Sequence, residues 1–157
     1  YPGQKIYVRV PNSKGDIVPG GLSIGFRCKR TVSSGTIQKG YVTCGHGCKD
    51  SEDGYVYVDY GNAANKTNPK GKIYDATFSG SVDASYNSTL EGVAFRNRVR
   101  VEGEFSKEGD SGGIVYTYAN NEYVPCGIIS SSAARAPYFS VFVKASEIAY
   151  YLNVQPF

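Results

Sequence analysis

Tryptophan and methionine are absent from this chain, and histidine occurs only once. No apolar run approaches the ~20 residues needed to cross a bilayer, so we expect no membrane partner. Lysine and arginine number 17 against 14 acidic residues, the net charge is +3, and no basic run is present. Nucleic acid is therefore not an expected partner. The 157 residues contain no repeat or flexible linker and predict one domain or two fused half-domains.

The chain has only four cysteines, Cys28, Cys44, Cys48 and Cys126. Their spacing indicates whether they bind a metal or form disulfides, which occur in oxidising compartments. Cys44, His46 and Cys48 are close enough in sequence to ligate zinc, with Cys28 as a fourth ligand. The paired Cys-x-x-Cys spacing of zinc ribbons is absent, so one or two disulfides are the favoured interpretation. The chain also starts at Tyr1, without a methionine or an apolar signal core, and we expect a processed, secreted, extracellular protein.

Short strand patterns separated by turn residues predict a mainly β fold. The expected strands are Lys5–Val10, Leu22–Arg27, Gly40–Thr43, Tyr55–Tyr60, Ile73–Phe78, Gly92–Val101, Gly113–Tyr118, Tyr123–Ser130 and Tyr138–Lys144. One helix is expected, at Ala145–Leu152, with Ser146 capping its first turn. Its core face would carry Ile148, Ala149, Tyr151 and Leu152.

The most informative stretch is Glu108–Gly113, which reads Glu-Gly-Asp-Ser-Gly-Gly and leads directly into an apolar strand. A glycine-flanked Ser111 in this setting can expose its hydroxyl while neighbouring backbone N–H groups face an incoming carbonyl. The same residues also suit an ordinary glycine-rich hairpin turn, and the motif alone leaves both interpretations open.

The single histidine, His46, follows the strand pattern of Gly40–Thr43 in a turn of small residues. A serine hydroxyl is a weak nucleophile near neutral pH unless a base accepts its proton, and imidazole titrates in that range. A lone histidine is more often a structural residue of the surface or the core. The presence of both motifs favours Ser111 as a nucleophile with His46 as its base.

Three stretches together resemble the chymotrypsin-like serine peptidases, closest to the bacterial branch of alpha-lytic protease and the streptogrisins. Gly21–Phe26 leading to Gly40–His46 resembles that branch's first-barrel strands and histidine turn. Glu108–Gly113 resembles its nucleophile loop, and Cys126–Ser132 resembles the strand that binds substrate backbone. The resemblance covers most of the chain.

This resemblance implies two antiparallel β-barrels. Residues 1–86 would form the N-terminal half, which carries the histidine and the acid, and residues 87–157 the C-terminal half, which carries the serine and the terminal helix. The third catalytic member would be Asp83, which precedes a short small-aromatic segment as in the family. Asp75 is the alternative, although within an alternating strand a solvent-facing carboxylate is the simpler interpretation.

The resemblance also assigns roles at the cleft. The backbone N–H groups of Gly109 and Ser111 would form the oxyanion hole, and Ser130, Ser131 and Ser132 would pair with the substrate as an added strand. It implies a protein or peptide substrate, no metal, no cofactor, a monomer, and maturation by removal of a pro-region.

The chain departs from the branch in its cysteines and in its length. Gly47 follows His46 where the branch has a cysteine, so the pairing is open: Cys28–Cys48 is the first choice, and Cys126 pairs with Cys44 or stays free. Asp83 to Ser111 spans only 28 residues, whereas three strands and their connections need roughly 40. Either the second barrel is short or a segment is missing between Ser85 and Leu90. A missing segment is favoured, because lost strands would leave unpaired edges.

Two rival functions follow from the same residues. One is a catalytically inactive peptidase homologue that binds proteins through the same cleft. The other is a secreted β adhesion module in which the motifs are coincidental. An intact triad argues against both.

Overall fold

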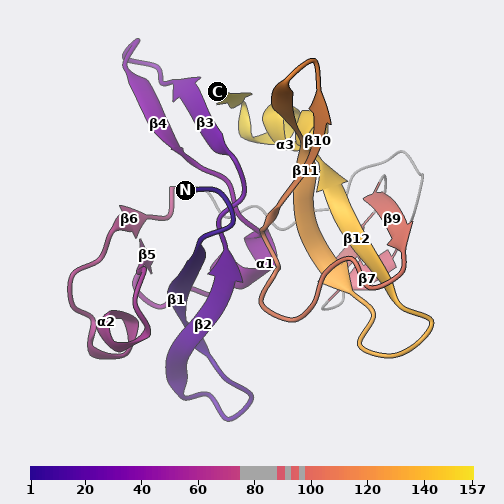
Figure 1. The fold of residues 1–157 in the computed structure, drawn as a ribbon. Helices are drawn as coiled ribbons and strands as arrows, with labels where there is room; N and C mark the ends of the chain where they lie inside the picture. The colour runs from indigo at the N-terminus through magenta and orange to yellow at the C-terminus, as the bar shows by residue number, and fades with distance from the viewer. Residues whose placement is uncertain (75–87, 91–92, 96–97) are drawn as a thin grey trace.

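The chain is mainly β, with several antiparallel sheets and a helix near the C-terminus (Figure 1). The structure is a computed structural model that describes residues 1–74, 88–90, 93–95 and 98–157. Within these residues no sheet closes into a barrel. The strands are β1 (Lys5–Pro11), β2 (Ile17–Ser23), β3 (Arg27–Thr31), β4 (Ile37–Tyr41), β5 (Tyr55–Val56), β6 (Gly71–Lys72), β7 (Ser88–Leu90), β8 (Val93–Phe95), β9 (Arg98–Glu102), β10 (Ile114–Ala119), β11 (Glu122–Ser132), β12 (Phe139–Lys144) and β13 (Gln155–Pro156). The helices are α1 (Gly45–Cys48), α2 (Tyr60–Asn65) and α3 (Ala145–Leu152).

The hairpin of β1 and β2 begins the fold. Its antiparallel register runs from Lys5 opposite Ser23 to Pro11 opposite Ile17. Ile6 and Val8 of β1 face the interior, and Arg9 beside Val8 is also buried. The hairpin thus ends at Ser23, which lies beside the loop that carries Ser111.

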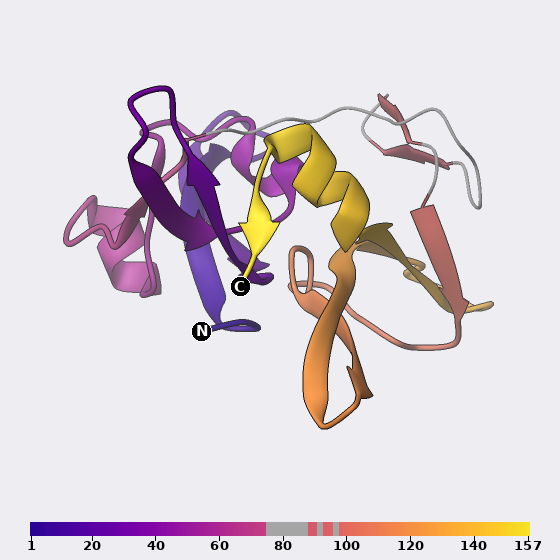
Figure 2. The ribbon, with the colours of Figure 1, turned by 90° about the horizontal axis from the view of Figure 1, so that it is seen from above.

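A second sheet combines segments from both ends of the chain. Its strand order is β13, β3, β4, and Gln155 of β13 lies opposite Lys29 of β3. Figure 2 shows the segment after α3 returning to these two strands. The chain end therefore packs onto a sheet formed by residues more than a hundred positions earlier.

The largest sheet has the order β10, β11, β12, β9 and is antiparallel throughout. Its register shifts twice, between Val115 and Tyr116 on β10 and between Ile129 and Ser131 on β11. Such bulges bend a strand and redirect the side chains beside them. The second one lies at the serines that the sequence assigns to substrate binding.

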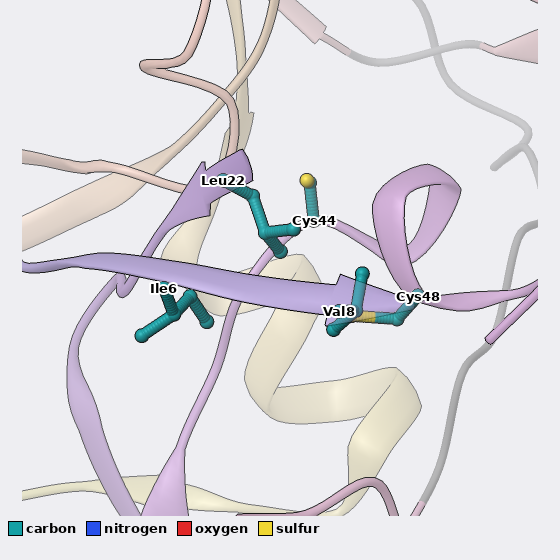
Figure 3. Packing of buried hydrophobic residues seen from close by; sticks show 5 residues of the cluster. All are labelled: Ile6, Val8, Leu22, Cys44 and Cys48. Carbon is teal, nitrogen blue, oxygen red and sulfur yellow. The ribbon is translucent and has the colours of Figure 1, made fainter. Parts of the chain in front are cut away.

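Two clusters of buried side chains form the core. The first contains Ile6, Val8 and Leu22 with two of the cysteines, Cys44 and Cys48 (Figure 3). The second joins Phe26, Cys28 and Val42 to Ile128 and Ile148. Because this second cluster draws on β3 and β11 as well as α3, it ties the start of the chain to its end.

The strands at β1, β10, β11 and β12 follow the sequence expectation closely. The single expected strand Gly92–Val101 is divided into β8 and β9, and most of Ile73–Phe78 lies outside the described residues. The prediction of a single helix is wrong, because α1 and α2 are also present. The expected strand Tyr55–Tyr60 is formed only at Tyr55–Val56, and α2 begins at its last residue, where the carboxylate of Asp59 accepts a hydrogen bond from Asn62 N–H at 3.0 Å.

The bounds of α3 agree with the sequence, but two of its details do not. The N-cap residue is Lys144 rather than Ser146, and its side chain makes no capping bond. Tyr151 is 52% exposed and does not belong to the core face, on which Ile148 is buried. The helix begins one residue before Ser146, so that residue lies inside the first turn and cannot act as the cap.

Candidate functional site

The loop that carries Ser111 is held in place by backbone hydrogen bonds. Ser23 N–H donates to the Ser111 carbonyl at 2.8 Å, and the Ser23 hydroxyl donates to the Gly109 carbonyl at 3.0 Å. Gly112 N–H donates to the Ile129 carbonyl at 2.8 Å. Asp110 closes the loop, since its side chain accepts from Lys107 N–H at 3.0 Å. This loop, residues 107–113, is named the nucleophile loop after the role that the sequence predicts for Ser111, and these bonds fix it between the β1–β2 hairpin and β11.

Gly112 brings this loop against the turn that leads to His46. It has a φ of +85°, and a Cβ built on it would lie 2.5 Å from the Ser23 carbonyl oxygen and 2.9 Å from Cys44 N. No other residue fits so close to backbone at a positive φ. Ser111 adjoins Gly112, and His46 lies two residues beyond Cys44, so the structure brings the two motifs together through their backbones.

His46 is the second residue of α1 and is half-buried. Lys49 N–H donates to the Gly45 carbonyl at 2.9 Å and completes the single helical turn around it. Thr43, just before the turn, donates its hydroxyl to the Ser23 carbonyl at 2.7 Å. Ser23 thus contacts both the nucleophile loop and the histidine turn, residues 43–49.

The two N–H groups predicted to form an oxyanion hole have no hydrogen-bond acceptor among the described residues. These belong to Gly109, at φ +93°, and to Ser111. The Asp110 carbonyl accepts from Gly113 N–H at 2.8 Å. In a trans peptide the N–H points opposite to the C=O, so Ser111 N–H points away from Gly113 and out of the loop. Within the described part of the chain, neither donor is taken up by the protein itself.

The two candidate acids cannot be located in this structure. Asp83 and Asp75 both lie outside the described residues. Of the interval in which a missing segment was expected, between Ser85 and Leu90, residues 85–87 also lie outside the described residues, whereas Ser88–Leu90 form β7.

Ser130, Ser131 and Ser132 lie at the end of β11, where one edge of the strand is open. Strand β12 pairs with Ser131 and Ser132, whereas the pairing with β10 reaches no further than Ile128. Within the described residues no strand covers the β10 side of these serines. An edge of this kind can accept an extended peptide as an added strand.

Two of these serines make side-chain hydrogen bonds that the sequence did not predict. Ser130 bonds to an arginine, and Ser132 belongs to a cluster of three hydroxyl groups with Ser106 and Ser140. Ser130 Oγ accepts a buried hydrogen bond of 2.6 Å from Arg98 Nη1. Ser106 Oγ donates to Ser140 Oγ at 2.8 Å and lies 2.5 Å from Ser132 Oγ. Because a hydroxyl has one proton to donate, Ser132 is the donor toward Ser106. No local sequence pattern predicts the roles of Ser106 and Ser140, because the cluster joins three segments that are far apart in the sequence.

A cavity of about 750 Å³ is lined mostly by residues of the first half of the chain, with Leu152 and Val154 from its end. Apolar side chains such as Ile6, Ile24 and Val42 line it, together with Cys44 and Cys48. Neither His46 nor Ser111 is among its lining residues. The candidate catalytic residues therefore do not line the cavity, although Cys44, Gly45 and Cys48 of the histidine turn do.

All four cysteines are free thiols, so neither expected disulfide pairing is formed. Cys28 packs in the second core cluster and Cys48 in the first. Burial raises the pKa of Cys28 and of Cys44, and it raises the pKa of Cys48 to about 12, with nearby Cys44 adding to the effect. In the described part of the chain, no three His, Cys, Asp or Glu side chains gather as ligands for a metal ion.

No family model matches the chain, and no curated protein is significantly similar to it. Among residues 1–74, 88–90, 93–95 and 98–157, no helix is long and apolar enough to cross a membrane. The functional assignment is therefore inferred from the loop, the turn and the open strand edge.

Proposed function

We propose that the chain is a serine endopeptidase in which Ser111 is the nucleophile and His46 the general base. The main support is the contact between the nucleophile loop and the histidine turn at Gly112, where only glycine fits. A serine nucleophile needs a base within hydrogen-bonding distance, and the contact at Gly112 holds the two segments against each other. The sequence contains no other histidine to supply that base.

Two further features suit peptide hydrolysis. The N–H groups of Gly109 and Ser111 have no acceptor within the described residues and suit an oxyanion hole. The open edge at Ser130, Ser131 and Ser132 suits a substrate bound as an added β-strand. An enzyme that binds an extended peptide and cleaves it next to the bound segment needs both features.

The reaction then follows the usual course of acyl transfer. Ser111 Oγ attacks the substrate carbonyl carbon while His46 accepts the hydroxyl proton. The two N–H groups stabilise the negative oxygen of the tetrahedral intermediate. His46 next gives its proton to the leaving amine, and a water molecule activated by His46 hydrolyses the acyl-enzyme.

The finer architecture and setting are part of the same proposal. We infer two chymotrypsin-like barrels, built from residues 1–86 and 87–157, and a secreted monomer matured by loss of a pro-region. Asp83 is the proposed acid that orients His46. These inferences depend on the family resemblance of the motifs and on the mainly antiparallel β fold.

Labelling with a fluorophosphonate tests the nucleophile. We expect the probe to modify Ser111 and no other serine, with a fluorophosphonate-reactive peptidase labelled in parallel, because only an activated hydroxyl attacks phosphorus at a useful rate. His46→Ala should abolish labelling, whereas Ser146→Ala, a change at an exposed residue of α3, should leave it intact. A folded, mature sample in which Ser111 stays unlabelled would support the inactive homologue that binds proteins through this cleft.

A pair of substitutions tests the acid. Asp83→Asn should lower kcat about ten-thousandfold with little effect on KM, because the amide favours the wrong imidazole tautomer. Asp75→Asn should change kcat little. Hydrolysis of a small ester, measured for both variants, decides between them. If Asp75→Asn abolishes turnover and Asp83→Asn does not, the acid is Asp75, and if neither matters, the triad is wrong.

A further inference from the structure

The histidine turn has a cysteine at each end. Cys44 is the N-cap of α1 and Cys48 is its last residue, with His46 midway between them. A helical rise of ~1.5 Å per residue places α-carbons four positions apart at a separation of ~6 Å. Disulfides join α-carbons that are ~4.4–6.8 Å apart, so the backbone of this turn is within the range that a disulfide bridges.

Both cysteine side chains pack in the first core cluster. Their residues are 4% and 5% exposed, in contact with the apolar group of Ile6, Val8 and Leu22. Figure 3 shows Cys44 beside Leu22 and Cys48 beside Val8, with the two sulfur atoms pointing in different directions. Rotation about the Cα–Cβ bonds is therefore needed to bring the sulfur atoms together.

The surroundings leave room for that rotation. Cys44, Gly45 and Cys48 all line the 750 Å³ cavity. Gly47 also lies in the turn, and a Cβ built on it would be 3.2 Å from Cys44 Sγ. A larger residue at this position would crowd the sulfur, whereas glycine leaves the space free. The cavity lining includes the exposed residues Tyr1 and Lys70, so a small reagent can enter from solvent.

The electrostatics of the reduced pair agree with their closeness in the turn. The pKa of Cys48 is raised to about 12, first by burial and then by the proximity of Cys44. The two sulfur atoms are thus near enough for a charge on one to disfavour a charge on the other. Because burial keeps both thiols protonated near neutral pH, exchange with a disulfide reagent requires an alkaline pH, at which the thiolate forms.

We propose that Cys44 and Cys48 form an intramolecular disulfide that closes the turn around His46. The oxidant is a low-molecular-weight disulfide of the glutathione type. One cysteine thiolate attacks a sulfur of the reagent, forms a mixed disulfide and releases one thiol. The second cysteine thiolate then attacks the protein sulfur of the mixed disulfide and releases the second thiol. Two protons and two electrons pass from the cysteine pair to the reagent.

The other two cysteines are less suited to this bond. Cys28 lines the same cavity but lies in β3 and packs in the second core cluster. A disulfide from Cys28 to Cys44 or Cys48 would have to join the two clusters. Cys126 lies on β11 and is absent from the cavity lining. Cys44 and Cys48 share one turn, and their link needs no movement of separate elements. The inference does not depend on the chemistry of Ser111.

Peptide mapping of the full chain tests the link. The protein is incubated with oxidised glutathione at alkaline pH, quenched with N-ethylmaleimide and digested with trypsin. The tryptic peptide of residues 40–49 contains Cys44 and Cys48 and no other cysteine. We expect it to lose two hydrogen atoms in mass and to resist alkylation until it is reduced. A cross-link between this peptide and the one containing Cys28 or Cys126, or full alkylation of both cysteines, overturns the proposal.

Matched variants and a second readout complete the test. The double variant Cys28→Ser, Cys126→Ser should keep the mass loss, and Cys44→Ala should abolish it. Hydrogen exchange of the amides of residues 45–49 in the wild-type chain gives an independent measure. Exchange should slow at least several-fold in the oxidised protein, because the link restrains the turn, and unchanged exchange in a sample shown to be cross-linked contradicts the proposed closing of the turn.

Discussion

The nucleophile loop and the histidine turn meet at one point but are held in different ways. The loop has almost no buried side chains, and its carbonyl and N–H groups bond to Ser23, Ile129 and one another. The turn makes few backbone bonds outside itself and is anchored by two buried thiols, Cys44 and Cys48. One segment is specified through its backbone, the other through packing.

This difference determines which substitutions each segment accepts. Backbone hydrogen bonds do not depend on side-chain identity, so the fold of the loop should tolerate substitution except at its glycines and at Asp110, whose side chain closes it. In the turn, side-chain volume matters, and the glycines serve to keep space open. Substitutions in the two segments should therefore differ in how much stability they cost and in which property they change.

The largest effect should come from Gly112→Ala. A Cβ at this position meets the Ser23 carbonyl and Cys44 N at a positive φ, so strain and overpacking add to a loss of about 3 kcal/mol or more in the free energy of unfolding. Gly103→Ala is the matched control, because Gly103 has a φ of +94° and nothing within 4 Å of an added Cβ. It should lose only about 1 kcal/mol. Thermal denaturation of both variants measures the difference, and equal losses would mean that the close contact at Gly112 is not needed.

A smaller effect is expected from Ser23→Ala. The variant loses the 3.0 Å hydrogen bond to the Gly109 carbonyl but keeps the backbone bond to Ser111, so stability should fall by about 1 kcal/mol. If the loop positions an oxyanion hole, kcat on an ester substrate should fall about tenfold with little change in KM. Ser34→Ala, which removes only an exposed bond to Thr36, serves as the control. A Ser23→Ala variant with unaltered kcat would show that this bond does not position the loop.

The smallest effect concerns the turn and depends on pH. Because burial raises the pKa of Cys48 to about 12, iodoacetamide should react with it far more slowly than with half-buried Cys126 at mildly alkaline pH. The folded state holds the Cys48 proton more tightly than the unfolded state does. Stability from this group is therefore complete below pH ~9 and falls as the pH rises toward 12. Mass spectrometry of timed, quenched samples measures both rates, and equal rates at the two cysteines would contradict the burial of Cys48.

The sequence predicts the C-terminal part of the fold better than the N-terminal part, for a physical reason. Strands β10, β11 and β12 carry long runs of β-branched and aromatic residues, and α3 has helical periodicity, so local pattern and tertiary structure agree there. The turn at α1 contains two glycines in four residues and has no local helical signal. Its shape comes from packing of Cys44 and Cys48, which only the folded chain provides.

The candidate site shows the same division. Ser111 and His46 could be proposed from the sequence, because the residue types that serve as nucleophile and base are few and occur in characteristic surroundings. Ser23 and Ser106 are not recognisable, because their contacts join segments dozens of residues apart. Supporting residues of this kind depend on topology, and single-sequence patterns do not contain it.

The pairing of β13 with β3 has a consequence for synthesis of the chain. Strands β3 and β4 are made early, yet the edge of β3 obtains its partner only when Gln155 and Pro156 have left the ribosome. Until then a row of unpaired backbone groups stays exposed, and such edges recruit other chains. A nascent chain whose synthesis is halted before residue 155 should therefore remain bound to chaperones longer than the released protein does.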